Sequence, residues 1–197
     1  MADALSCMFH ALRNHLSRTL ALATLCTLGL VLATTPAFAD DVITTIDISG
    51  KGSNTTVTID KPGSYRLYGS SSTTWVHVKT GNVTLYLADG LNINPGISAN
   101  TGKTCPSIKI ENTGGTVNII SEANAQAKLS SYLTSPAIQK EGTQTKLVFS
   151  TADSEHPGTI SATAASGSMS AGIGTNYKLV SNGVTGNIVF KSGKVIA

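Results

Sequence analysis

The chain has 197 residues, of which 41% are hydrophobic and 13% charged, and its formal net charge at pH 7 is +3. This composition is too apolar for a disordered chain, and the charge is too small and too scattered for a nucleic-acid-binding protein. Beyond the N-terminal segment, no apolar run is long enough to span a bilayer, which argues against a membrane span in the mature protein.

The N-terminal segment has the pattern of a secretory signal peptide. Arg13 precedes the apolar run Leu20–Ala33, and the small residues Ala37 and Ala39 form an A-x-A cleavage pattern. The apolar run is too short to cross a membrane comfortably. We therefore expect cleavage after Ala39 and a protein that is secreted or held at the cell surface. An apolar N-terminal core helix is the alternative interpretation.

Cleavage of residues 1–39 would leave Cys105 as the only cysteine of the mature chain, residues 40–197. The exported domain would then be held together by its core and not by disulfides. Cys105 precedes Pro106 and has no histidine near it in the sequence. A small buried side chain is therefore favoured over a nucleophile or a metal ligand.

Short segments in which β-branched or aliphatic residues alternate with polar ones recur along the mature chain. Such alternation is typical of strands with one buried face, and the Gly, Asn, Ser and Thr clusters between the segments are typical of turns. Only Glu122–Leu133 has a spacing that fits a helix, and it fits a loop equally well. We therefore predict an all-β domain, with strands in 44–48, 55–59, 75–79, 83–87, 107–110, 116–119, 145–149 and 186–190.

Some of these segments form a repeated unit of a strand, a charged residue, a Gly-containing corner and a second strand. Aligning Val78, Ile110 and Ile138 gives a period of roughly 30 residues, which is the scale of solenoid repeats. This predicts a parallel β-helix of about four to five rungs, with residues 40–74 as the N-terminal cap and first strands and residues 75–197 as the rungs. A β-sandwich would explain the alternation but not the shared corner pattern.

Alternation also predicts which side chains face the interior of the coil. Corners that need a positive φ angle or a close backbone approach are expected at Gly81, Gly114, Gly115 and Gly142. The side chains expected to point inward are Val76, Val78, Val83, Leu85, Leu87, Ile108, Ile110, Val117 and Ile119.

The later repeats resemble a known group of proteins. The segments concerned are Ser135–Ile138, Gly158–Ala164, Ser170–Gly174 and Gly186–Ala197. They are similar to the repeats of bacterial surface or secreted proteins with right-handed parallel β-helix domains of the carbohydrate-binding type. The resemblance covers roughly residues 76–197; it implies a right-handed coil and an extracellular, non-enzymatic role in glycan binding or adhesion, and it assigns no binding residue.

The end of the sequence departs from this pattern. The chain stops at Lys194–Ala197 in the middle of a repeat, where the proteins that it resembles continue with further rungs. An uncapped coil end exposes backbone groups that pair readily with another chain. We therefore expect either that the chain is a piece of a longer coil or that this end meets another chain.

Acidic residues are the first candidates for catalysis, because cleavage of polysaccharides requires paired carboxylates or clustered acids with a base. Glu111 and Glu141 occupy equivalent corners and are expected to stack on one face, where a cation or water would have to separate them. Asp153, Glu155 and His156 share a loop that is either a cation site or, more simply, a solvated turn. We therefore expect a non-catalytic protein, without a metal or cofactor.

Outward-facing aromatic side chains are better candidates for function. Sugars dock on aromatic faces with polar groups nearby, since their C–H faces are apolar and their hydroxyls need partners. Alternation turns three aromatic and two basic side chains outward, in a chain with only 5% aromatic residues. We take them as candidate glycan-binding residues: Trp75, Tyr86, Tyr68, His77 and Arg66. The alternative is that the aromatic residues cap the N-terminal end of the coil.

Taken together, these inferences favour an exported, non-catalytic module that binds a polysaccharide or surface glycan, or that serves in adhesion. One alternative is a structural fragment of a larger β-helix adhesin with no ligand of its own. The other is a polysaccharide lyase or hydrolase whose catalytic site is assembled only by the fold.

Overall fold

A computed structural model of the chain describes residues 42–52, 55–96, 105–165, 170–175 and 186–197. Within these ranges the chain forms strands, turns and bends, and no α-helix is present. Residues Asp41–Ala197 make up one compact unit. The predicted signal peptide, residues 1–39, lies outside the described residues.

The strands form three parallel sheets, which we name A, B and C. Sheet A has the order β1 (Ile43–Asp47), β3 (Gly63–Tyr68), β6 (Val83–Leu87), β9 (Thr116–Ser121), β12 (Lys146–Thr151) and β15 (Ile188–Phe190). Sheet B consists of β2 (Thr55–Ile59), β5 (Thr74–Val78), β8 (Ile108–Ile110), β11 (Ile138–Lys140) and β14 (Ile173–Gly174). Sheet C contains β4 (Ser70–Ser71), β7 (Asn92–Ile93), β10 (Gln126–Ser130), β13 (Thr159–Thr163) and β16 (Lys194–Ile196).

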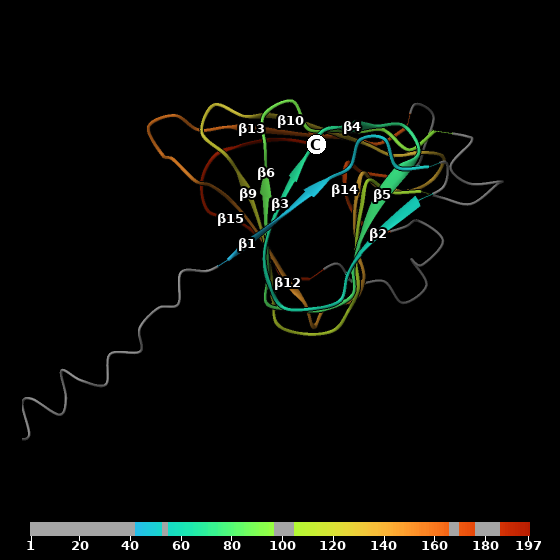
Figure 1. Ribbon diagram of the computed structural model, residues 1–197. Helices are drawn as coiled ribbons and strands as arrows, with labels where there is room; N and C mark the ends of the chain where they lie inside the picture. Colours follow the sequence, from blue (N-terminus) through green and yellow to red (C-terminus); the bar gives the residue numbers. More distant parts are fainter. Residues whose placement is uncertain (1–41, 53–54, 97–104, 166–169, 176–185) are drawn as a thin grey trace, which may run out of the picture. The chain divides into compact units, whose positions relative to one another are not determined.

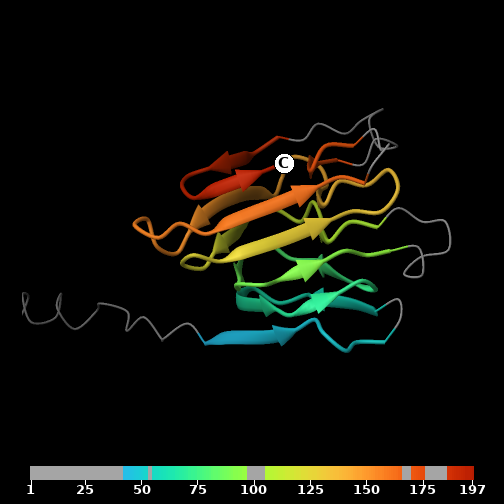
Figure 2. The same cartoon turned by 90° about the horizontal axis from the view of Figure 1, so that it is seen from above.

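The chain visits the three sheets in a fixed cycle, and this cycle makes the fold a parallel β-solenoid of about five rungs. From β3 onward each strand pairs in parallel with the strand three places further along the chain. Seen along the coil axis, the sheets surround a common interior (Figure 1). Seen from the side, the rungs follow one another from β1 at one end to β15 and β16 at the other (Figure 2). The predicted all-β coil is thus confirmed.

The interior is built from the predicted apolar positions. All nine side chains expected to point inward are fully buried, and Leu67 joins them. Successive rungs place like residues on one another: Leu85 of β6 pairs with Ile119 of β9, which pairs with Phe149 of β12. Burial of one such side chain stabilises the fold by about 1.5–3 kcal/mol. Each rung is therefore held by its neighbours, as expected for a solenoid.

The register of the third repeat differs from the predicted alignment. Val78 pairs with Ile110, as expected, but Ile138 pairs with Ile108, so Lys140 stands opposite Ile110. The alignment was wrong by two residues because it matched the last aliphatic residue of each strand. In this rung a lysine, which is fully buried, occupies that inward position.

Two further predictions concern local conformation. Glycines at the corners have positive φ angles, 83° at Gly114, 71° at Gly115 and 57° at Gly142, whereas at Gly81 a Cβ atom would collide with the Gly114 carbonyl group. The segment Glu122–Leu133, whose spacing fits a helix or a loop, instead contains strand β10, which pairs with β7 and β13.

Candidate functional site

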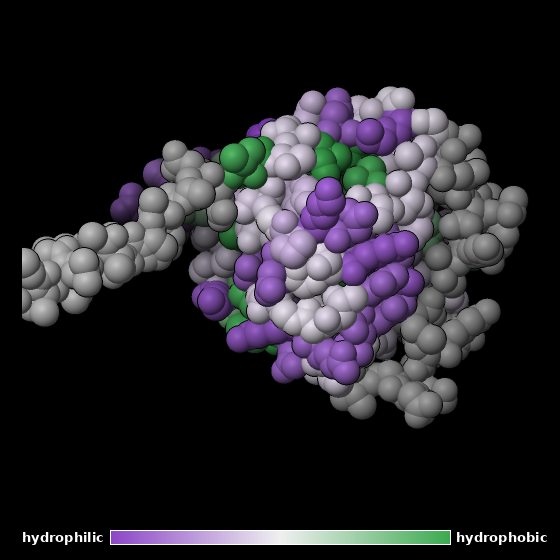
Figure 3. All heavy atoms as spheres, turned by 60° about the horizontal axis from the view of Figure 1, so that its bottom comes forward, coloured by the Kyte–Doolittle hydropathy of each residue, from purple (hydrophilic) through white to green (hydrophobic). Residues whose placement is uncertain are grey.

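The five candidate binding residues lie on two different faces of the coil. Arg66 and Tyr68 belong to β3 and Tyr86 to β6, so these three lie on the outer surface of sheet A or at its edge. Trp75 and His77 belong to β5, in sheet B. They alternate with the buried Val76 and Val78 and therefore face outward. Where sheets B and A meet, the surface is mostly polar (Figure 3).

On sheet B, Trp75 and His77 form an aromatic pair. Their ring centroids lie 5.3 Å apart and their planes are inclined by 26°, an offset-stacked geometry. The two residues stand two apart on one strand, so alternation places both on the same side of the sheet. Both are half-buried. The pair thus presents a fixed aromatic surface next to the polar side chains of the following rungs.

His77 is held in its neutral form. Its Nε2 atom lies 2.8 Å from Glu111 Oε1 in the next rung, yet the contact lacks hydrogen-bond alignment. Burial lowers the pKa of His77, and Lys109 lowers it further, whereas Glu111 acts in the opposite direction. The net shift is downward from 6.5, so the ring is mainly neutral at pH 7 and the contact is polar but not an ion pair.

The two stacked glutamates are partnered by side chains of the protein. Glu111 and Glu141 each donate their backbone N–H to the preceding rung, to Val78 O and Ile110 O, and so occupy equivalent positions. The Lys109 ammonium group lies 3.0 Å from Glu141 Oε1. Each carboxylate thus has a basic side chain of the preceding rung within reach, and the charge of Glu141 is balanced without a bound cation.

On sheet A, Arg66 is engaged by Glu122. Its Nε and Nη2 atoms donate to the two carboxylate oxygens of Glu122 at 2.5 and 2.8 Å. Its guanidinium carbon also lies 6.0 Å from the centre of the Tyr68 ring. Tyr86 stands beside Arg66 on the neighbouring strand. Glu122 takes two of the five N–H groups of Arg66, and three remain for other partners.

Glu122 and the polar neighbours of Trp75 were not among the predicted site residues. Glu122 lies 56 residues from Arg66 in the sequence and in a different rung. Lys109 and Glu111 lie one rung beyond His77, and they meet it only because β5 and β8 are paired. The one available signal was the equivalence of Glu111 and Glu141 within the repeat.

Neither the loop that contains Asp153 and His156 nor the surroundings of Cys105 form a metal centre in the described residues. The Asp153 carboxylate accepts hydrogen bonds from the backbone N–H groups of Glu155 and His156 and lies 3.0 Å from His156 Nδ1, so it serves the turn itself. Cys105 is buried, and its backbone pairs with Tyr132. In the part of the chain that the structure describes, no group of three or more His, Cys, Asp or Glu side chains is arranged to hold a metal ion.

Comparison with known proteins adds no further assignment. No protein-family model, curated protein or solved structure matches the chain. Among the described residues, no helix has the length and apolar character needed to cross a bilayer. The coil architecture therefore follows from the sheet topology, and a function has to be argued from the geometry of the surface.

Proposed function

We propose that the protein is an exported, non-catalytic module that binds a glycan, and that the outer surface of sheet B around Trp75 is its binding surface. The observation that carries the proposal is the stacked pair of Trp75 and His77 beside a ladder of polar side chains. A sugar ring packs its C–H face on an aromatic surface and satisfies its hydroxyls with nearby donors and acceptors. The signal-peptide pattern of residues 1–39 supports export.

Sheet B suits this role better than sheet A. On sheet A two N–H groups of Arg66 are held by Glu122, and Tyr68 packs against the same guanidinium group. On sheet B, Lys109, Glu111 and Glu141 retain partly exposed side chains, with exposed fractions of 25%, 33% and 28%. They lie on or directly after strands β8 and β11, which follow one another at about 4.8 Å, so an extended polysaccharide can contact several rungs at once.

The charges of this surface favour a neutral glycan. Lys79 and Lys109 are balanced by Glu111 and Glu141, and the downward pKa shift of His77 keeps its ring mainly uncharged at pH 7. A polyanionic polysaccharide would meet two carboxylates as well as two ammonium groups. We therefore expect tighter binding to neutral polysaccharides than to sulfated or uronic-acid polymers.

Tryptophan fluorescence tests the proposal directly, because Trp75 is the only tryptophan of the chain. The purified protein is titrated with soluble neutral and polyanionic polysaccharides, and affinity electrophoresis measures binding by the Trp75→Ala variant, which has no such signal. We expect a saturable fluorescence change with a neutral polymer and at least about tenfold weaker binding by Trp75→Ala. Tyr86→Ala, on the outer surface of sheet A, is the matched control and should bind as the wild type does.

Three other results would contradict the proposal, each in a different way. Equal losses in Trp75→Ala and Tyr86→Ala would remove the binding surface from sheet B. A folded protein that binds no polysaccharide would favour a structural segment of a larger adhesin. New reducing ends or unsaturated sugar products would establish a hydrolase or lyase and refute the non-catalytic proposal.

A further inference from the structure

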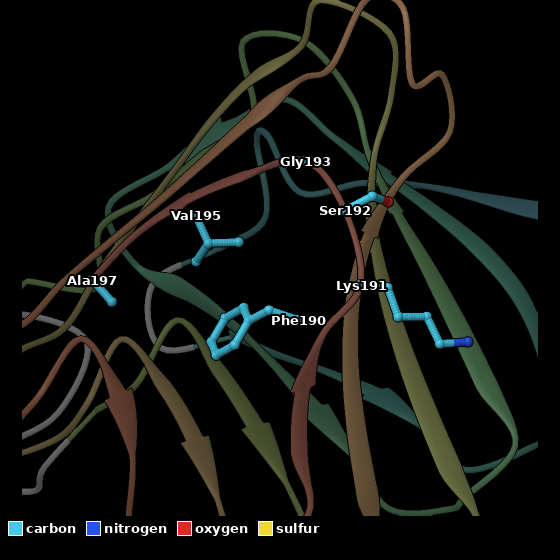
Figure 4. A pocket seen from close by; sticks show the side chains of 6 residues that line it. All are labelled: Phe190, Lys191, Ser192, Gly193, Val195 and Ala197. Carbon is cyan, nitrogen blue, oxygen red and sulfur yellow. The ribbon is translucent and has the colours of Figure 1, made fainter.

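The coil ends in a hollow at β15 and β16. Its volume is about 400 Å³, and Figure 4 shows Phe190 and Val195 extending into this open hollow while the Lys191 side chain points away from it. Phe190 stacks on the fully buried Phe149 of the preceding rung at 5.1 Å, yet it is itself 59% exposed. It holds an interior position of the coil, but no described strand pairs with β15 beyond it. Ile196 of β16 is 49% exposed.

At the opposite end of the coil, the first strands have unpaired edges that could continue sheets A and B of another copy. Strands β1 and β2 lie at the outer edges of sheets A and B and each pair with a single neighbour among the described strands. Their outer sides carry backbone N–H and C=O groups available for pairing. All pairings within the three sheets are parallel. A second copy placed further along the coil axis would therefore continue the sheets with the same strand direction.

The registers show which residues such a copy would bring together. In sheet A, one column of paired residues runs from Thr44 of β1 through four intermediate strands to Phe190 of β15. Counting along each strand from this column, Asp47 takes the corner position of Gly193, next to Lys194. The Asp47 carboxylate accepts a hydrogen bond from the Ser49 N–H at 2.8 Å, which lowers its pKa and keeps it ionised.

We propose that the β15–β16 end of the coil receives the β1–β2 end of a second copy of this chain, head to tail, with Lys194 of one copy next to Asp47 of the other. Two β15–β16 ends meeting each other would instead gather Lys191 and Lys194 from both copies, and like charges in an interface are costly. A head-to-tail contact uses two different surfaces, and because each copy here continues the coil axis of the previous one, the assembly extends instead of closing into a ring. The copies would thus form filaments, along which the surfaces around Trp75 repeat and bind multivalently.

Sedimentation of the purified protein over a range of concentrations tests this proposal. We expect the mean mass to rise beyond that of a dimer as the concentration increases. Asp47→Lys and Lys194→Asp should each weaken association by about tenfold, because each places like charges at the junction. An equimolar mixture of the two variants should regain association as alternating filaments, because both kinds of mixed junction again bring opposite charges together. Lys128→Asp, an exposed lysine in the middle of sheet C, is the matched control and should assemble as the wild type does.

Each contrary result is distinct. A protein that stays monomeric at every concentration would overturn the proposal. If Lys194→Asp strengthened association while Asp47→Lys had no effect, the contact would join two β15–β16 ends. Association that is indifferent to both substitutions would place the contact away from the coil ends. Far-UV circular dichroism of each variant establishes that the coil is intact, so that a lost assembly is not mistaken for unfolding.

Discussion

Among the described residues, Lys140 is the one charged side chain in the buried interior of the coil. It is fully buried and stands opposite Ile110, in a column otherwise formed by aliphatic side chains. Its ammonium group donates a hydrogen bond to Gly142 O at 2.5 Å. A lysine in this position must either remain charged without a counterion or give up its proton. Burial accordingly lowers the pKa of Lys140 from its ordinary value of 10.5.

Replacement of Lys140 by methionine should therefore stabilise the protein. Methionine has a similar length and fits a column of aliphatic side chains, and it removes the desolvation penalty of the ammonium group together with one hydrogen bond. Exchanging buried charged groups for apolar side chains of similar volume stabilises proteins by about 1–4 kcal/mol in cases where the change is favourable. We expect about 2 kcal/mol near pH 7, equivalent to a rise in Tm of roughly 4–8 °C for a protein of this size.

The gain should depend on pH in a definite direction. Between the lowered pKa of folded Lys140 and the ordinary value of 10.5, the unfolded chain binds more protons, so the wild type becomes more stable as the pH rises through this range. The advantage of Lys140→Met should therefore be largest below the lowered pKa and should shrink as the pH approaches 10.5.

Urea denaturation at several pH values measures this difference. Lys146→Met changes an exposed lysine of β12 and should leave the stability within about 0.5 kcal/mol of the wild type. A Lys140→Met variant that is less stable at pH 7, or an advantage that stays constant up to pH 10.5, would refute the reasoning. In either case the ammonium group would be stabilised in the interior by more than its one hydrogen bond.

Two further predictions concern His77 and the corner glycines. Because the pKa of folded His77 is below 6.5, the free energy of unfolding should decrease as the pH falls from 6.5 toward that lowered pKa, and His77→Gln should reduce this pH dependence, as measured by urea denaturation. If His77→Gln left the pH dependence of the free energy of unfolding unchanged, the lowered pKa of His77 would not be its cause. Gly90→Ala should cost about 1–2 kcal/mol, because φ is +70° there and nothing lies within 4 Å of the new Cβ. Gly81→Ala should cost more, because its Cβ would collide with the backbone of Gly114, and equal costs would refute the steric explanation.

The coil could be predicted from the sequence because each rung repeats the same alternation of inward aliphatic and outward polar residues. Strands such as 83–87 alternate aliphatic and polar residues, and a period of roughly 30 residues returns aliphatic residues to the same interior position. Both patterns are visible in a single sequence, because one lies within a strand and the other relates neighbouring repeats. The buried side chains of β5, β6, β8 and β9 are those that alternation indicates.

The sequence did not predict features in which strand pairing between rungs overrides the local residue pattern. Strand β10 contains Gln, Ala, Lys and Leu, which favour helices in isolation. It is a strand because β7 and β13 pair with it on both sides. Lys140 was missed for a related reason, since alternation cannot identify an interior position that is filled by a charged residue. Both features depend on contacts between rungs, which no local pattern encodes.

The candidate site was predictable only in part. Alternation within β5 and β6 indicates that Trp75 and Tyr86 point outward, but it does not indicate that they lie on different faces of the coil. A sharp corner separates these consecutive strands and places them in different sheets. The partner of Arg66 was likewise hidden, because Glu122 reaches it across the stack of rungs.

The position of Trp75 bears on its role as an end cap. The coil begins in sheet B with β2, and β5 is paired with β2 on one side and with β8 on the other. Trp75 therefore lies within the sheet and not at its terminal edge, and its indole contacts the ring of His77 on the outer surface. A residue that covers the open end of a coil would belong to the first strand or precede it. A half-buried, outward tryptophan in an internal rung is therefore not an end cap, and its position is compatible with the glycan-binding role proposed for it.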